Sequence, residues 1–291
     1  MAGRCVEGGF RDDNPDIREV SNAAALQTLY KQMAASAEIT IDTEYDVHDA
    51  VPTKKTVYLP DAKLLCVGVG TSTEEPVWVV PARLVTKDLT RMMYGKTIVA
   101  HGTKGDLNVL AWFIDRDIWK HLGDIECTMS MHAVLDQGRA ENDLVTMCAA
   151  LLGVADWKSS CWKEVDNENL RRKARGEPQH ATLADIPFSV YMDMNGRDVY
   201  NTMRLLSHLR TNMPPPAVYE TLLKPALKAA ALTELNGLGG SRQYQEILLR
   251  RYNEKIDEYQ RILESLPECQ RIVSYLPQIR ADEKMRKVKE K

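Results

Sequence analysis

The stretch Ile39-Thr40-Ile41-Asp42-Thr43-Glu44-Tyr45-Asp46 combines a strand pattern with two closely spaced acids. Apolar and polar residues alternate along it, as they do in a strand with one buried face. Residues two apart in a strand point to the same side, so Asp42 and Glu44 share a face. Two like charges held that close raise each other's pKa unless a cation lies between them. The stretch therefore predicts either a solvated strand end or, if further acids join it, a site for Mg²⁺ or Mn²⁺.

Composition places the chain among ordinary globular proteins, because 291 residues with 44% hydrophobic and 27% charged residues can build one good-sized core. No apolar run is long enough to cross a membrane, and residues 1–16 lack the apolar core of a secretory signal, so we expect a cytoplasmic protein. Six scattered cysteines without a Cys-x-x-Cys pair argue for reduced thiols and against a zinc site. A net charge of −3 argues against bulk coating of nucleic acid, but it allows an enzyme that grips a few nucleotides at a metal-filled acidic site.

Hydrophobic periodicity predicts an α/β domain over residues 36–212, between a lead-in over residues 1–35 and a helical extension over residues 213–291. We expect residues 1–20 to be polar and poorly ordered. Strands are predicted at 39–46, 64–70, 77–80, 97–100 and 123–128, the first three as an antiparallel meander. Helices are predicted at 22–35, 106–114, 129–135, 143–152 (capped by Asn142) and 189–210, with irregular chain over 156–187.

The helical extension reads as a hairpin that follows Pro214-Pro215-Pro216. Its first helix is predicted over residues 218–235. The second begins near Ser241 and carries an apolar stripe at spacings of three and four, a pattern more typical of ordinary packing than of a partner groove. The stripe consists of Tyr244, Leu248, Tyr252, Ile256, Tyr259, Leu263 and Leu266.

Two further acids lie on the predicted helices of the α/β domain. Asp198 heads a core-facing stripe and should point inward, whereas Asp193 belongs to the solvated face of the same helix. The stripe behind Asp198 consists of Thr202, Leu205 and Leu209, and the solvated face carries Arg197, Tyr200 and Arg204. Asp106 opens its helix, where it can act as a simple cap favoured by the helix dipole or as a buried acid. A buried carboxylate needs a partner, and a shared metal ion supplies one.

These segments resemble the 3′–5′ exonuclease domain of the DEDD superfamily, which has the ribonuclease-H-like fold, and are most similar to the proofreading domain of family A DNA polymerases, phage enzymes included. The motifs are Ile41-Asp42-Thr43-Glu44, Val99-Ala100-His101 with Asp106-Leu107, and Asn195-Gly196-Arg197-Asp198 with Thr202. The interval is 62 residues from Glu44 to Asp106 and 92 from Asp106 to Asp198. The resemblance covers about residues 36–212. Residues 218–237 are similar to the segment that leads to the polymerase thumb, so the second predicted helix would be the thumb base.

The resemblance implies an α/β enzyme with two Mg²⁺ or Mn²⁺ ions that hydrolyses the 3′ end of single-stranded DNA, as in replication proofreading. It would act in the cytosol of a bacterium or of a phage-infected cell. Asp42 would bridge both ions, Glu44 and Asp198 would hold the ion that activates water, and Asp106 would hold the second through water. The expected partners are a single strand or primer 3′ end and, as a further option, a separate polymerase chain. The residues expected to contact the strand are His101, Thr43, Tyr45, Thr202 and Tyr191.

Departures from the family pattern leave alternatives open. Gly102 and Gly105 replace the usual Asn and Phe of the second motif, and Met194 and Asp193 stand where a Tyr or His would orient the attacking water. Tyr191 is a candidate substitute. The alternatives are a catalytically weak or inactive module that binds a primer end or a polymerase subunit, an RNA-trimming enzyme of the ribonuclease D kind, and self-association through the C-terminal hairpin.

Two features have a structural and a functional interpretation each. His101 follows a buried strand, where a histidine is more often hydrogen-bonded within the protein than used as a ligand. The basic run Arg171-Arg172-Lys173 with Arg175 can grip phosphates, but such a run is more often a solvated loop.

Overall fold

The structure is a computed structural model of the 291-residue chain, in which residues 14–47, 62–135, 142–212, 214, 216–237 and 242–267 are described. It divides into two compact units, one that ends at Asn236 and one that begins at Gly237. Among the described residues no helix is long and apolar enough to cross a membrane. Residues 1–13, part of the predicted lead-in, lie outside the described residues.

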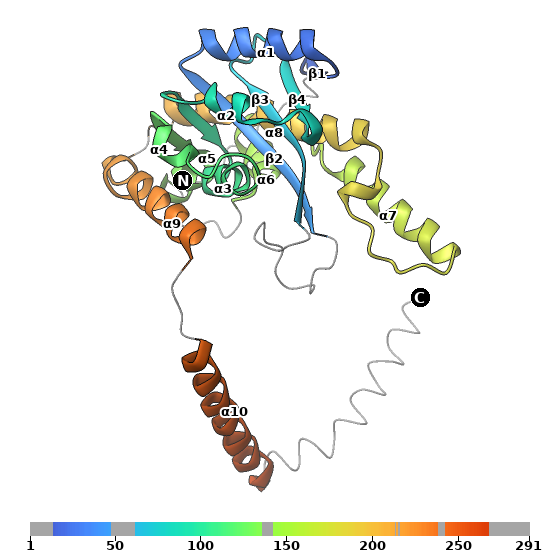
Figure 1. Ribbon diagram of the computed structural model, residues 1–291, viewed down its shortest axis with the longest axis vertical. Helices are drawn as coiled ribbons and strands as arrows, with labels where there is room; N and C mark the ends of the chain where they lie inside the picture. Colours follow the sequence, from blue (N-terminus) through green and yellow to red (C-terminus); the bar gives the residue numbers. More distant parts are fainter. Residues whose placement is uncertain are drawn as a thin grey trace. The chain divides into compact units, whose positions relative to one another are not determined.

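The first unit is built on a mixed sheet of six strands in the order β1-β4-β3-β2-β5-β6 (Figure 1). The strands are β1 Ile17–Glu19, β2 Glu38–Val47, β3 Ala62–Gly70, β4 Val77–Pro81, β5 Thr97–Ala100 and β6 Asp124–Cys127. The predicted meander is confirmed, because β3 pairs antiparallel with both β2 and β4. The prediction that residues 1–20 are poorly ordered is wrong for β1, which pairs in parallel with β4.

The helices of the first unit mostly lie where periodicity predicts them. They are α1 Ala23–Ala35, α2 Lys87–Arg91, α3 Thr103–Phe113, α4 Ile118–His121, α5 Thr128–Leu135, α6 Leu144–Leu152, α7 Ser159–Ala174, α8 Phe188–Asn212 and α9 Lys224–Asn236, with 3₁₀ turns at Ala82–Leu84 and Leu183–Asp185 and a π-helical turn at Tyr219–Leu223. Helix α6 is capped by the Asp143 side chain, one residue later than predicted. Helix α3 begins at Thr103 because Gly102 adopts the left-handed conformation just before it, so Asp106 lies in its first turn instead of opening it.

Helix α7 occupies the segment that was predicted to be irregular, and that prediction is wrong. The segment is highly charged, but its charges lie at helical spacings. Arg171 pairs with Glu168 at 3.2 Å and with Glu164 at 2.9 Å. Cys161 and Val165, four residues apart, give the helix its buried side.

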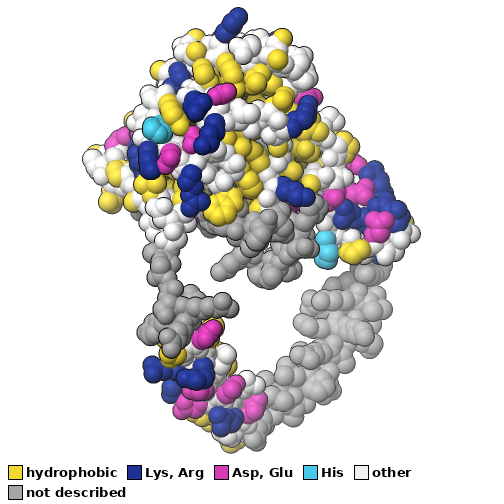
Figure 2. All heavy atoms as spheres, viewed as in Figure 1, with side chains coloured by type: hydrophobic (Ala, Val, Ile, Leu, Met, Phe, Trp, Pro, Cys, Tyr) yellow, Lys and Arg dark blue, Asp and Glu magenta, His cyan; other side chains and the backbone are white. Residues whose placement is uncertain are grey.

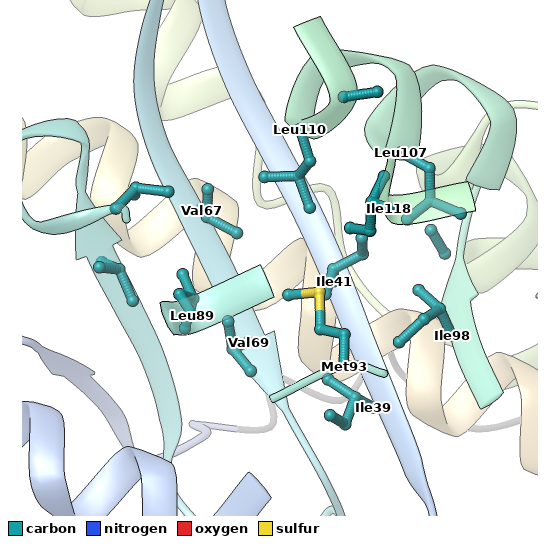
Figure 3. Packing of buried hydrophobic residues seen from close by; sticks show 14 of the residues in the cluster. Ile39, Ile41, Val67, Val69, Leu89, Met93, Ile98, Leu107, Leu110 and Ile118 are labelled. Carbon is teal, nitrogen blue, oxygen red and sulfur yellow. The ribbon is translucent and has the colours of Figure 1, made fainter. Parts of the chain in front are cut away.

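The strands distribute their residues alternately between two helical layers. On one face Ile39 and Ile41 pack with Leu89 of α2 and with Leu107 and Leu110 of α3 (Figure 3). The alternate residues of β2, which include Asp42, face the opposite side of the sheet, where α8 passes behind it (Figure 1). The alternation places Asp42 and Glu44 beneath α8.

Gly68 of β3 lets α8 approach the sheet beside Asp42. It pairs with Asp42 across the two strands. A Cβ atom at Gly68 would lie 2.4 Å from the Asn195 side-chain oxygen and 2.7 Å from Val199. Because these contacts are shorter than any real Cβ contact, a larger residue would push α8 off the strand.

Residues 216–236 pack on the sheet through a buried polar group that we call the Glu126 cluster. Glu126, at the end of β6, accepts a hydrogen bond from the Tyr219 hydroxyl at 2.9 Å and one from the Lys224 ammonium at 3.2 Å. Lys224 also contacts Asp124 at 2.7 Å and Glu220 at 3.0 Å. The remaining member, Arg210, lies 3.5 Å from Glu126. The cluster explains why the compact unit continues to Asn236, past the predicted start of the helical extension at residue 213.

Helix α10, Arg242–Ser265, is the described part of the second unit. The predicted helix is confirmed. Most of its apolar stripe is exposed, as Tyr252, Ile256, Tyr259, Leu263 and Leu266 show. The predicted hairpin concerns the placement of α9 relative to α10 and stays a prediction.

Candidate active site

Three of the four predicted acids come together over the middle of β2, beyond its last pairing with β5 at Thr40. The strand continues to Val47, so Asp42 and Glu44 do not form a strand end. Carboxylate oxygens of Asp42 and Glu44, from β2, and of Asp198, from α8, all lie within 4.8 Å of one another. Asp198 is 1% exposed, whereas Asp42 and Glu44 remain half-buried and open to solvent on one side. Asp193, the neighbour predicted to point outward, pairs with Arg197 and has a side chain that is 50% exposed. The helical stripe therefore distinguished the two acids of α8 correctly.

Asp106 lies next to this group but outside the set of atoms within 4.8 Å. Its carboxylate accepts hydrogen bonds from the Thr43 amide at 2.9 Å and from the Thr43 hydroxyl at 2.8 Å. These bonds fix Asp106 against the strand residue between Asp42 and Glu44. We call Asp42, Glu44, Asp106 and Asp198 together the carboxylate cluster.

Three residues that the sequence analysis missed hold the acids in place. The Asn195 side-chain amide donates to Asp42 Oδ2 at 2.7 Å. The Trp157 indole N–H donates to Asp198 Oδ1 at 2.9 Å, and the Lys158 ammonium lies 2.8 Å from Asp198 Oδ2. Asn195 belongs to the third motif, which predicts no role for it. Trp157 and Lys158 precede α7 in the segment predicted to be irregular, where spacing carries no signal.

Burial and mutual repulsion make the cluster resist ionisation. Burial, and then the charges of Asp198, Asp106 and Glu44, raise the pKa of Asp42 well above its usual range. Burial and the charge of Asp198 raise the pKa of Glu44 to about 8. Burial raises the pKa of Asp106 to about 7, although the Thr43 hydrogen bonds oppose the shift. Burial also raises the pKa of Asp198 despite the opposing charge of Lys158. Among the described residues Lys158 is the cation that pairs with these four acids, so the cluster carries more negative than positive charge.

The residues present fit a divalent cation. The ligand atoms are hard carboxylate oxygens from two elements, which is the donor set that Mg²⁺ and Mn²⁺ prefer. No described residue donates a well-aligned hydrogen bond to the buried Asp198 Oδ2, although Lys158 pairs with it. An ion pair without a directed hydrogen bond leaves this oxygen able to accept a metal ion.

His101 is tied to the protein through both ring nitrogens. Nδ1 lies 2.9 Å from the Thr128 hydroxyl and Nε2 lies 2.8 Å from the Asn142 carbonyl. Burial lowers its pKa to about 4, so the ring is neutral. This arrangement favours the structural interpretation of His101.

The other residues predicted to contact a nucleic-acid strand lie on β2 and α8, which also carry three of the acids. Thr43 holds Asp106 through a hydrogen bond. The register between β2 and β3 shifts between Glu44 and Tyr45, and such irregularities are common beside active sites. Tyr191 packs edge-on against Phe188, and burial and the nearby Cys66 and Glu44 raise its pKa to about 12, so its hydroxyl stays protonated. Thr202 is buried on α8, which is typical of a packing residue.

Met194 lies where the family pattern has a water-orienting tyrosine. Its side chain is apolar and 2% exposed. It therefore offers no proton donor or acceptor to the cluster. Any such group must come from another position.

The basic run of residues 171–175 lies at the end of α7 and not in a loop. Arg172 pairs with Asp185, and Arg175 pairs with Glu168 at 3.0 Å and Glu177 at 2.8 Å. Figure 2 shows basic and acidic side chains intermixed over this end of α7. These charges are largely neutralised by their neighbours.

Comparison with solved structures identifies the fold. No family model matches the sequence, and no curated protein matches it. The chain is similar to RNase D of Trypanosoma brucei in complex with RNA U12 (13% identity, TM-score 0.55, 75% of this chain and 71% of that chain) and in complex with GMP (13%, 0.54, 78% and 74%). It is also similar to Brucella melitensis NrnC bound to pGG (14% identity, TM-score 0.48, 77% of this chain and 91% of that chain). The RNase D likeness confirms the predicted ribonuclease-H-like α/β fold.

Proposed function

We propose that this protein is a 3′–5′ exonuclease that uses divalent metal ions to remove nucleotides from a single strand. The observation that carries the proposal is the carboxylate cluster. Acids from β2, α3 and α8 gather over the middle of β2, and among the described residues Lys158 is the cation paired with any of them. A fold shared with RNase D supports the same reaction class.

The chain's own residues would position the ligands. Asp42, Glu44 and Asp198 would hold one ion, and Asp42 with Asp106 would hold a second. Bound there, two ions supply a Lewis acid for the leaving 3′ oxygen and lower the pKa of the attacking water. Asn195 fixes Asp42, Trp157 fixes Asp198 and Thr43 fixes Asp106, each through a hydrogen bond of 2.7–2.9 Å.

For the substrate we propose single-stranded DNA or a primer 3′ end, with proofreading beside a separate polymerase chain as the biological setting. The support is the resemblance of the three acidic motifs and of residues 218–237 to family A polymerases. RNA is the second candidate, because the similar RNase D of Trypanosoma brucei is in complex with RNA U12. Tyr45 and Tyr191 would stack on the terminal bases.

A weak or inactive module is the alternative that Met194 favours. Tyr191 is our candidate for the missing water-orienting group, since it lies on the same helix and near enough to Glu44 for the acid's charge to affect its pKa. Tyr191→Phe removes the hydroxyl and keeps the packing. We expect the rate to fall while Mn²⁺ binding stays unchanged; an unchanged rate would return Tyr191 to a packing role.

The main experiment follows the shortening of 5′-labelled single strands of DNA and RNA, in parallel, with Mg²⁺ and with EDTA. We expect a ladder of products with Mg²⁺ alone, and its loss in Asp198→Asn. Asp193→Asn is the matched control, since Asp193 lies on the same helix but faces solvent. Equal activity of the two variants, or no shortening of either strand by the wild-type protein, would refute the proposal.

A further inference from the structure

Lys158 and its neighbour Trp157 occupy both oxygens of the most deeply buried acid of the carboxylate cluster. The Trp157 indole donates to Asp198 Oδ1 at 2.9 Å, and the Lys158 ammonium lies 2.8 Å from Oδ2. The turn that presents them is held by Asp156, whose carboxylate accepts the Lys158 amide at 2.8 Å and the Ser159 amide at 3.3 Å. The two side chains thus approach Asp198 from a fixed backbone.

The two contacts to Asp198 differ in how easily they can break. The Trp157 indole is buried and its hydrogen bond is well directed. The Lys158 side chain is 31% exposed, and its long flexible chain can move the ammonium into water without disturbing the backbone. Lysine also binds as a point charge, whereas a divalent ion would need the same Oδ2 atom as a ligand.

Lys158 offsets part of the negative charge of the carboxylate cluster when no metal ion is bound. Among the described residues it is the cation that pairs with the cluster, against four carboxylates. Its charge also acts on Asp42 and Glu44, not on Asp198 alone. A divalent ion bound at Asp198 Oδ2 would carry a larger positive charge than the ammonium and would repel it.

We propose that Lys158 is the resident cation of the carboxylate cluster, and that a divalent ion displaces its ammonium from Asp198 Oδ2 on binding. This inference rests on the proposed metal-dependent function of the site. Lys158 holds the metal-free cluster together and competes with the first ion. Trp157 stays on Oδ1 in both states and keeps the carboxylate aimed at Asp42 and Glu44.

The test compares wild type, Lys158→Met and Lys163→Met by calorimetric titration of the metal-free protein with Mn²⁺. Lys163 lies exposed on α7 and serves as the matched control. Loss of the competing charge should tighten the first Mn²⁺ dissociation constant about tenfold or more in Lys158→Met, and leave Lys163→Met unchanged. In EDTA the Tm of Lys158→Met should fall below that of wild type, and saturating Mn²⁺ should abolish the difference.

A second measurement follows the wild-type protein, and a conservative variant serves only to assign its signal. With ¹³Cε-labelled lysine, the NMR signal absent from Lys158→Arg is assigned to Lys158. Mg²⁺ should shift this signal with the same concentration dependence as the heat of binding. A Lys158 signal that does not respond to saturating Mg²⁺, or unchanged Mn²⁺ affinity in a folded Lys158→Met, would overturn the inference while leaving the exonuclease proposal intact. No saturable binding by wild type or Lys158→Met would overturn both.

Discussion

The carboxylate cluster and the Glu126 cluster are two groups of acids built around one sheet, and they differ in charge balance. In the Glu126 cluster one buried acid, Glu126, is matched by the buried Lys224 and by Arg210, and its oxygens accept hydrogen bonds from Tyr219 and Lys224. The other acids that contact Lys224, Asp124 and Glu220, have side chains that are 53% and 49% exposed to solvent. In the carboxylate cluster four acids share Lys158, and Asp198 Oδ2 lacks a well-aligned donor among the described residues. Balanced charge indicates a structural role, and the deficit of positive charge indicates a site for a cation.

The largest expected effect comes from breaking the unbalanced cluster. Asp42→Asn should reduce Mg²⁺-dependent shortening of a single strand about a thousandfold or more, because several kcal/mol of charge stabilisation depend on the ligand. In EDTA the same substitution should raise the Tm or leave it unchanged, since it removes a charge that burial and Asp198 already disfavour. The introduced amide oxygen can still accept from Asn195. A lower Tm in EDTA would show that Asp42 stabilises the fold, as a member of a balanced cluster would.

Breaking the Glu126 cluster should have the opposite effect, a loss of stability without a loss of activity. Lys224→Met leaves Glu126 buried without its nearest cation, which should lower the free energy of unfolding by about 3–5 kcal/mol. Activity per folded molecule should not change. Urea denaturation measures the first quantity, and assays well below the Tm measure the second. Lys228→Met, one turn away and exposed, is the control. A loss of activity in folded Lys224→Met would contradict the separation of the two clusters.

The pH dependence of stability should sharpen the comparison further. The pKa of Glu44 is raised from 4.5 to about 8 and that of Asp106 from 3.8 to about 7. Between the unfolded and the folded pKa values, the two groups therefore bind more protons in the folded protein than in the unfolded chain. Their contribution to stability is fully present below about pH 4 and is lost as the pH rises towards 8. Thermal denaturation in EDTA should show this fall, and saturating Mn²⁺ should remove it. A Tm that rises across this range in EDTA would contradict the predicted repulsion.

The smallest effect is expected from ending the chain at Gly237. Both clusters belong to the unit that ends at Asn236, so the shortened protein should keep its Tm within about 2 °C, less than the shift from 1 kcal/mol. Its rate on a short single strand should also be unchanged. Light scattering on the same protein tests whether the exposed stripe of α10 causes self-association. A large loss of Tm would mean that residues after Gly237 stabilise the first unit.

Periodicity predicted which way three of the acids face, and the resemblance to the exonuclease motifs predicted that the acids meet. Alternation along β2 placed Asp42 and Glu44 on one face, and the α8 stripe turned Asp198 inward and Asp193 outward. Helix α3 was predicted three residues too short at its start because Gly102 in the left-handed conformation, not Asp106, marks the helix entry. The sheet and most helices follow from the same periodicities.

The residues that hold the acids could not be predicted in the same way. Trp157 and Lys158 act on Asp198 from 41 and 40 positions away, in a turn without periodicity. Asn195 acts through its contact with Asp42 across Gly68, which depends on how closely α8 approaches β3. Helix α7 was missed because its charged composition suggested solvent, while its ion pairs lie at helical spacing and Cys161 and Val165 give it a buried side. Contacts between distant segments form only in the folded chain.

The most direct test is anomalous diffraction from crystals of the wild-type protein grown with Mn²⁺. We expect an anomalous peak between Asp42, Glu44 and Asp198, with the Lys158 ammonium moved away from Asp198, and a second peak on the side of Asp106. A saturating Mn²⁺ soak that leaves the cluster without an anomalous peak and Lys158 still on Asp198 would contradict the account.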